Sequence, residues 1–333
     1  MFKKTLIAMS LAAVTGSAMA DVAVSGRVEQ TFTKTDSATA ATDQWIGGTD
    51  NNIVFNVTED LGNGLTAFAK VALDVDATDA TGTAAHTHTI TNVTNNGQSQ
   101  ISSSAASTVA APTEQSDMIV GIKGSFGTVM AGHFEAFVEG KLASTMSMNG
   151  HASIEQSSTN AGRTDNGVAY ISPTVNGIHV GIGGYATASE SEAFDAKEIA
   201  VFYANGPLSV SVAQQKLNDT LAGTGLARKT TALAASYTMG DAKVSYLRMS
   251  NNDVDGVDSD DNSYRLDYTM GANKVTVGHL DDESNTSATA AANDITSIEL
   301  THNFSKRTQV YIGMTDQDTA NSDTTYLGMQ HSF

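Results

Sequence analysis

The chain has 333 residues with no cysteine and only three prolines, and its 18 basic and 36 acidic residues give a net charge of −18. Without cysteine it can form neither disulfides nor thiolate metal sites. The excess of acidic residues argues against nucleic acid as a partner, because phosphate binding needs a basic surface.

The first twenty residues have the pattern of a secretory signal peptide. Lys3 and Lys4 give a positive start, residues 6–14 form a short apolar run, and small residues lead to Ala20. The run is too short to span a bilayer as a helix, so we expect export across the inner membrane and cleavage after Ala20. The mature chain 21–333 would keep 16 basic and 36 acidic residues, a net charge of −20.

Beyond this leader, apolar and polar side chains alternate with a period of two, which is typical of strands with one apolar and one polar face. The first strand divides its residues into two sets, Val22, Val24, Val28 and Phe32 against Arg27, Glu29 and Thr31. Similar alternation follows at 65–76, 263–270 and 308–315. Strands of an outer-membrane barrel have this pattern, because only one side of each strand meets lipid.

Short turns and longer polar connections alternate along the chain. Gly, Asn or Asp, which tight turns require, occur in most of the short ones. The seven turns are 60–64, 124–127, 174–177, 204–207, 239–241, 271–272 and 304–307. The eight longer connections are 34–50, 77–116, 134–165, 186–196, 218–228, 251–262, 282–293 and 316–322. This pattern predicts an all-β fold, a sixteen-stranded antiparallel transmembrane β-barrel with short periplasmic turns and long external loops.

The last strand has to pair with the first, because an open sheet edge cannot face lipid. Its residues Leu327, Met329, His331 and Phe333 share one face, and the chain ends on an aromatic at the expected membrane boundary. Residues 77–116, rich in Thr, Ala, Ser and Asn, have a composition that does not build a core of its own.

Three segments resemble the Gram-negative general porins, a family of trimeric sixteen-stranded barrels. Residues 326–333 are similar to the family's terminal strand, in which the last Phe, here Phe333, is an outer-membrane assembly signal. Residues 119–132 are similar to its fourth strand, turn and fifth strand, and residues 166–177 to the next hairpin. The fifth strand of the family usually ends in Gly-Arg, whereas Gly132 is followed here by His133.

The resemblance implies a channel in the outer membrane of a Gram-negative bacterium, for passive diffusion of small hydrophilic solutes and ions. It also implies a homotrimer, contact with outer-membrane lipid and lipopolysaccharide, insertion by the barrel-assembly machinery, and a third long loop that folds into the barrel. The acidic charge favours a mild preference for cations.

The third long loop, 134–165, supplies the expected pore constriction. Glu135 and Glu139 are the candidates for its acidic side, and the candidate basic residues opposite them are Arg27, Lys70, Lys123 and Arg163. Opposed charges across a narrow aqueous space would set up a transverse field that orders dipolar solutes and sorts ions. Alternation alone places only Arg27 and Lys70 inside the barrel, and the pairing with the acidic side rests on the resemblance. The alternative for each of these residues is an ordinary solvated charge in the lumen.

Neither a metal site nor a cofactor is expected. Residues 251–261 are rich in Asp and Asn, but they lack the spacing of an EF-hand and are interpreted as an acidic external loop. His86 and His88 could project the same way, yet two ligands do not complete a zinc site. Met146 and Met148 are expected to pack against the barrel wall.

An enzyme is not expected either, because the sequence has no His-Glu-x-x-His, P-loop or Gly-x-Ser-x-Gly motif. Sixteen strands fit a wide, water-filled lumen, whereas small barrels fill their own interior. Two alternatives stay open. One is a solute-selective channel, although 6% aromatic residues and the single Trp45 show no evident aromatic slide. The other is a structural or adhesive barrel whose long loops bind partners.

Overall fold

The computed structural model describes residues 20–37, 46–75, 89–95, 98–104, 113–149, 154, 162–186, 193–218, 229–254, 257–283, 294–318 and 322–333. The predicted signal peptide, apart from Ala20, lies outside the described residues, as do His86 and His88.

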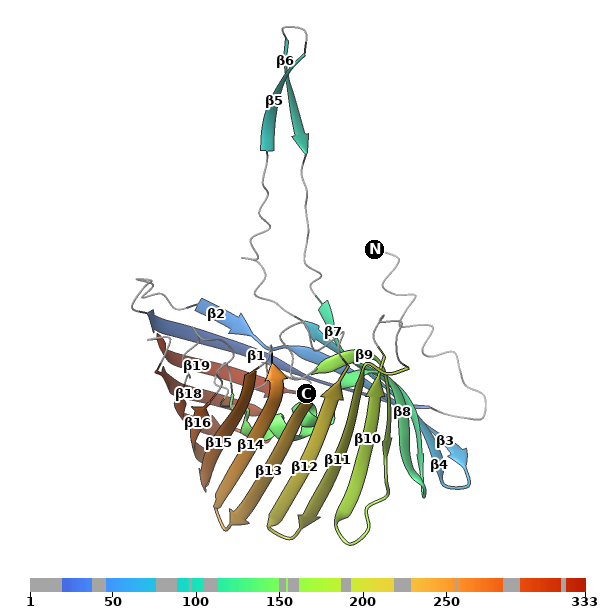
Figure 1. The fold of residues 1–333 in the computed structure, drawn as a ribbon. Helices are drawn as coiled ribbons and strands as arrows, with labels where there is room; N and C mark the ends of the chain where they lie inside the picture. Colours follow the sequence, from blue (N-terminus) through green and yellow to red (C-terminus); the bar gives the residue numbers. More distant parts are fainter. Residues whose placement is uncertain are drawn as a thin grey trace.

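The chain forms a closed antiparallel barrel of sixteen strands, as the sequence predicted (Figure 1). The strands are β1 Asp21–Ser37, β3 Asn52–Gly62, β4 Leu65–Val75, β7 Thr113–Gly124, β8 Gly127–Glu135, β9 Arg163–Ile171, β10 Ile178–Tyr185, β11 Ala196–Asn205, β12 Leu208–Leu217, β13 Lys229–Met239, β14 Ala242–Val254, β15 Val257–Met270, β16 Asn273–Asp282, β17 Ile295–Asn303, β18 Thr308–Gln317 and β19 Ser322–Ser332. A short strand, β2 Ile46–Thr49, also pairs with β1. It pairs with residues 30–33 of β1, next to the residues 21–27 that pair with β3, and so lies in line with β3 in the wall.

The first and last strands close the barrel, which confirms the expected pairing. Their register runs from Arg27 opposite Ser332 to Ser37 opposite Ser322. Beyond it, Gly26 and Phe333 exchange two backbone hydrogen bonds of 3.1 and 3.0 Å. The closed sheet therefore leaves no row of unpaired backbone groups to face lipid.

The two faces of β1 have the predicted polarity. Val24 and Val28 are 52% and 57% exposed on the outside, whereas Glu29 and Thr31 are buried on the inside. The outer side of the strand is thus apolar and the inner side polar, which suits a barrel with lipid outside and water within.

The short turns lie where the sequence placed them. Asn176 and Gly177 connect β9 to β10 with φ angles of 52° and 83°, and Asn63 and Gly64 connect β3 to β4 with 53° and 76°. Positive φ at both central residues is the requirement that makes Asn-Gly common in two-residue hairpins.

The prediction of a loop at 251–262 was wrong. β14 continues to Val254 and β15 begins at Val257, with Asn251 opposite Ser259 and Ser250 opposite Asp260. The polar composition suggested a loop, but polar residues on the inner face of a porous barrel do not interrupt a strand.

Residues 77–116 also contain more regular structure than their composition suggested. They include a separate hairpin, β5 Thr89–Asn95 paired with β6 Gln98–Ser104. Thr, Ile and Val, which favour strands, make up five of the seven residues of β5. The only helices among the described residues are η1 and η2, introduced below, and neither has the length and apolarity needed to cross a membrane.

Candidate functional site: the inward-folded third loop

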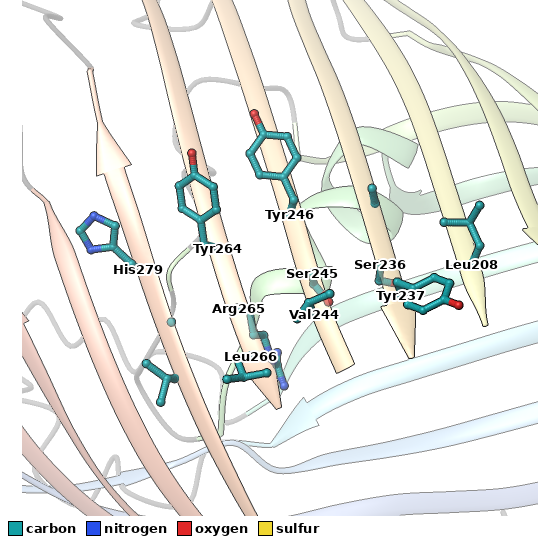
Figure 2. Close-up of a pocket in the computed structure, with 13 residues that line it drawn as sticks. Leu208, Ser236, Tyr237, Val244, Ser245, Tyr246, Tyr264, Arg265, Leu266 and His279 are labelled. Atoms are coloured by element: carbon teal, nitrogen blue, oxygen red, sulfur yellow. The ribbon is translucent and has the colours of Figure 1, made fainter. Parts of the chain in front are cut away.

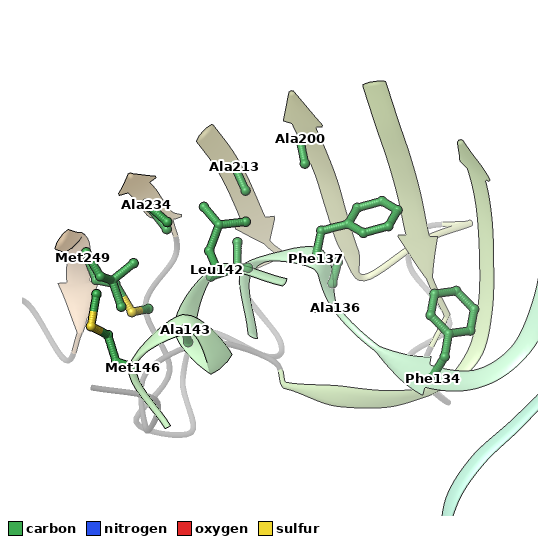
Figure 3. Packing of buried hydrophobic residues seen from close by; sticks show 14 of the residues in the cluster. Phe134, Ala136, Phe137, Leu142, Ala143, Met146, Ala200, Ala213, Ala234 and Met249 are labelled. Carbon is green, nitrogen blue, oxygen red and sulfur yellow. The ribbon is translucent and has the colours of Figure 1, made fainter. Parts of the chain in front are cut away.

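After β8 the chain turns into the barrel and packs against its inner wall (Figure 3). It forms a π-helical turn, η1 Val138–Leu142, and a 3₁₀ turn, η2 Ala143–Met146. Val138, Leu142 and Met146 have no exposed surface. Their spacing of four residues puts them on one side of the turns, which is the side facing the wall.

The wall makes room for this segment with small residues. The buried, inward-facing alanines of β11, β12 and β13 are Ala196, Ala200, Ala213, Ala232 and Ala234. Gly181 has a similar role, because a Cβ atom there would lie 2.7 Å from the ring of Phe137. At Gly167 a Cβ atom would lie 2.7 Å from the ring of Phe134. The large side chains of the loop therefore occupy volume that the strands leave empty.

A buried carboxylate holds the beginning of the loop. The backbone N–H of Phe137 donates to both carboxylate oxygens of Glu198 at 2.9 Å, and the hydroxyl of Tyr185 donates to the same group. Hydrogen bonds to a charged acceptor are stronger than neutral ones, and they satisfy an acid that would otherwise be costly to bury. Glu198 thus fixes the point at which the chain leaves β8.

Polar side chains of β15, β17 and β18 hold the segment that directly follows η2. Arg265 donates to the carbonyl oxygen of Ser147. The amide of Asn149 donates to Glu299 at 2.7 Å and accepts from Gln309 at 3.0 Å. The segment is therefore attached to the wall at both ends and along its apolar side.

The two methionines of the loop pack as predicted. Met146 belongs to the main buried cluster, and Met148 packs against the paired rings of Tyr311 and Tyr326. These rings lie 6.1 Å apart, and the hydroxyl of Tyr311 donates to buried Glu29 at 2.5 Å.

Four charged residues of alternating sign meet at the root of the loop. Arg163 lies 3.7 Å from Glu135 and 3.4 Å from Asp117, and Lys70 lies 2.5 Å from Asp117. We call these four residues the root cluster. It joins β4, β7, β8 and β9, and its side chains keep between 14% and 36% of their surface exposed. The cluster is therefore accessible to water and ions.

The other predicted residues lie apart from the root cluster. Arg27 forms ion pairs with Glu29, at 3.5 Å, and with Asp50. Glu139 is a partly exposed residue of η1. Lys123 is the exposed next-to-last residue of β7, beside the turn to β8, and is thus at the far end of the strand from the loop. The structure brings together three of the six residues named from the sequence.

Sequence reasoning missed Asp117, Glu198 and Asn149. Asp117 has the same parity as Lys123 on β7, so alternation could have placed it inside. Glu198 has the parity of the inward alanines of β11. The anchoring amide of Asn149 has no recognisable signal in one sequence, because its partners are more than a hundred residues away.

The described part of the chain contains no candidate metal site. No group of three or more His, Asp or Glu residues there has an arrangement that could hold an ion.

Known proteins are similar to this chain over nearly its whole length. A family model described as Gram-negative porin covers residues 7–322. The chain is 26% identical over 359 residues to outer membrane porin protein 32 of Delftia acidovorans, covering 98% of this chain and 92% of the relative.

Two solved structures share the fold. The anion-selective porin from Comamonas acidovorans is similar with a TM-score of 0.68 and 20% identity, covering 95% of this chain and 100% of that one. OmpF of Salmonella typhi in complex with daunomycin gives a TM-score of 0.72 at 13% identity, covering 94% of this chain and 97% of that one.

Proposed function

The chain belongs to the Gram-negative porin family and lies in the outer membrane, and from this premise we propose that it forms a water-filled channel for passive diffusion of small hydrophilic solutes and ions, with a mild preference for cations. The observation that carries the proposal is the loop attached along the inner wall, with a charged cluster at its root. A loop held on one wall supports a fixed narrowing of the lumen, which suits a passive channel.

The preference for cations rests on local charge balance. Each of three inward basic residues is paired with at least one acid, and the acids outnumber the bases by four to three. The bases are Arg27, Lys70 and Arg163, and the acids are Glu29, Asp50, Asp117 and Glu135. Because each of these three bases has an acidic partner, they do not form a net positive surface opposite Glu135 and Glu139. The net charge of the whole chain, −18, also favours cations over anions.

Further parts of the proposal follow from family membership. We expect a homotrimer, contact with lipopolysaccharide, and insertion by the barrel-assembly machinery with Phe333 as the signal. We expect removal of residues 1–20, no catalytic activity and no cofactor.

Purified protein in a planar bilayer tests the main proposal. Open conductance steps should occur in groups of three, and the reversal potential under a KCl gradient should have the sign of cation preference. Absence of conductance refutes the channel, and an anion sign refutes the selectivity.

The loop acids can be tested in the same assay. Glu135→Gln combined with Glu139→Gln should lower the preference for cations, because two negative charges leave the loop. The matched control is Asp60→Asn with Asp241→Asn, which removes one charge near the end of β3 and one at the turn between β13 and β14, both on the opposite end of the strands. An unchanged reversal potential in the loop variant, or an equal change in the control, would show that these acids are not the filter.

A further inference from the structure

A cavity of about 450 Å³ lies against β13 to β16 at the end of the barrel that carries the short turns. The turn between β13 and β14 borders it on one side. Three basic and two acidic side chains are among the residues that line it, namely Lys243, Arg265, Lys274, Asp241 and Asp267. The cavity is therefore polar and charged.

The two lysines of this cavity point from the wall into the lumen. Lys243 of β14 is directly opposite Asp267 of β15, which is directly opposite Thr276 of β16. Asp267 and Thr276 are buried on the inner face, and the hydroxyl of Thr276 donates to Asp267 at 2.8 Å. Residues directly opposite each other share a face of a sheet, and so do residues two positions apart on one strand. Lys243 and Lys274 thus lie on the inner face.

Arg265 connects the cavity to the inward-folded loop. It lies on β15 between Tyr264 and Leu266, which face outward, so its own side chain is on the inner side (Figure 2). Its guanidinium donates to both carboxylate oxygens of Asp267, at distances from 2.9 to 3.2 Å, and to the carbonyl oxygen of Ser147. Arg265 therefore occupies the acid that lies between the two lysines.

The lysines have no acid of their own. Within the described residues, no ion pair joins Lys243 or Lys274 to a carboxylate. Arg265 and Asp267 balance each other, and Asp241 at the exposed turn is the second acid of the lining. With three bases and two acids the cavity has a net charge of +1, in a chain whose net charge is −18. This local excess of positive charge favours an anion.

The spacing of the lysines suits one small anion. A single strand separates them, so they are roughly 10 Å apart across the sheet and roughly 7 Å apart along it, or about 12 Å between Cα atoms. Their flexible stems can bring both ammonium groups to a ligand placed between them. Thr238 is directly opposite Lys243, and Thr269 is directly opposite Lys274. Both threonines are exposed and line the cavity, so their hydroxyls can donate to the same ligand.

We propose that this cavity binds a small tetrahedral oxyanion of charge −2, the chemistry shared by sulfate and hydrogen phosphate, between the ammonium groups of Lys243 and Lys274. Two ammonium groups match its two charges, and the hydroxyls of Thr238 and Thr269 donate to its other oxygens. The site lies between the loop and the short turns, on other strands than the root cluster. It goes beyond the proposed function, because passive diffusion does not require a bound anion.

Isothermal titration calorimetry of the purified protein in detergent, at about 0.1 M salt and with sodium sulfate as the probe, tests the site without relying on conduction. The wild-type protein should bind one sulfate per chain, and sodium chloride at the same ionic strength should give no saturable heat. Lys274→Gln should weaken sulfate binding by about tenfold, because one charge acts on two at about 4 Å in screened water. Lys243→Gln with Lys274→Gln should weaken it by about 100-fold.

The matched control is Lys306→Gln with Arg307→Gln. It removes two exposed positive charges from the turn between β17 and β18, at the same end of the barrel, and should leave sulfate binding unchanged. Sodium phosphate at pH 8, titrated in the same way, should bind as well, and the tighter of the two anions is the one assigned to the site.

A variant with the opposite expected sign separates binding from a disturbed fold. Asp267→Asn removes a negative charge about 6 Å from the anion and leaves Arg265 unbalanced, so it should strengthen sulfate binding by about fourfold. A structural disturbance alone would weaken binding instead. Unchanged single-channel conductance in each variant shows that the barrel is intact.

Three results would overturn the proposal. They are the absence of saturable sulfate binding to the wild-type protein, equal binding by the double lysine variant, and an equal loss in the Lys306 and Arg307 control. A protein that conducts but does not bind sulfate loses this site and keeps the proposed function. Sulfate binding by a protein that does not conduct would support the site and refute the channel.

Discussion

Replacing Asp117 by Asn should make the channel less selective for cations. The carboxylate lies 2.5 Å from Lys70 and 3.4 Å from Arg163, and Glu135 is the second acid of the root cluster. With two acids and two bases the cluster is formally neutral. The amide has nearly the same shape but no charge, so Asp117→Asn changes the local charge from 0 to +1.

The size of the effect follows from Coulomb's law. A monovalent ion that passes about 5 Å from one added charge changes in energy by about 0.8 kcal/mol in water, and screening at 0.1 M salt reduces this to about 0.5 kcal/mol. Cations and anions change in opposite directions, so their difference is about 1 kcal/mol. The ratio of cation to anion permeability should therefore fall by about fivefold.

Reversal potentials of purified wild-type and variant channels at about 0.1 M KCl measure this ratio. At about 1 M KCl most of the difference should disappear, because the Debye length falls to about 3 Å. Asp241→Asn removes one charge at the turn between β13 and β14 and serves as the control. An unchanged ratio at low salt, or an equal shift in the control, would refute the assignment of the root cluster to the ion path.

Three further predictions concern stability and processing. Gly181→Val should push the ring of Phe137 off the wall and the loop further into the lumen. It should therefore lower the single-channel conductance, and it should lower the thermal midpoint measured by circular dichroism, because overpacking costs about 1–3 kcal/mol. An unchanged conductance would show that this contact does not position the loop. Tyr311→Phe removes the donor to buried Glu29 and should reduce the free energy of unfolding in urea by about 1.5–3 kcal/mol, and no change in the midpoint would contradict that role. Protein extracted from outer membranes should begin at Asp21 by intact mass, and a mass that includes residues 1–20 would refute cleavage.

The strand pattern was predictable because the physics behind it is local. Side chains alternate between lipid and water at every second residue, and the Asn-Gly turn at 176–177 needs positive φ at both positions. Polar composition wrongly predicted a loop at 251–262, because the sequence of a strand that lines the lumen can be as polar as the sequence of a loop. Burial of Asn251 and Asp261 on the inner face separates the two cases only once the barrel is closed.

The site was predictable in part. Parity and family resemblance indicated Glu135, Lys70 and Arg163, which the structure brings to one cluster. The acid that joins them, Asp117, depends on where β7 begins after a long polar stretch, and strand boundaries are the least certain part of such reasoning. The anchor at Glu198 depends on contacts between distant strands, which one sequence does not reveal.

The attachment of η1 and η2 is one-sided, and this determines the route of a solute. Their main contacts fall on β12 to β15. The facing wall of β1, β3, β4 and β7 carries Arg27, Lys70 and Asp117. The water-filled cross-section therefore lies off the barrel axis, next to that wall. A solute that enters the channel passes along this one charged surface and does not contact the whole circumference.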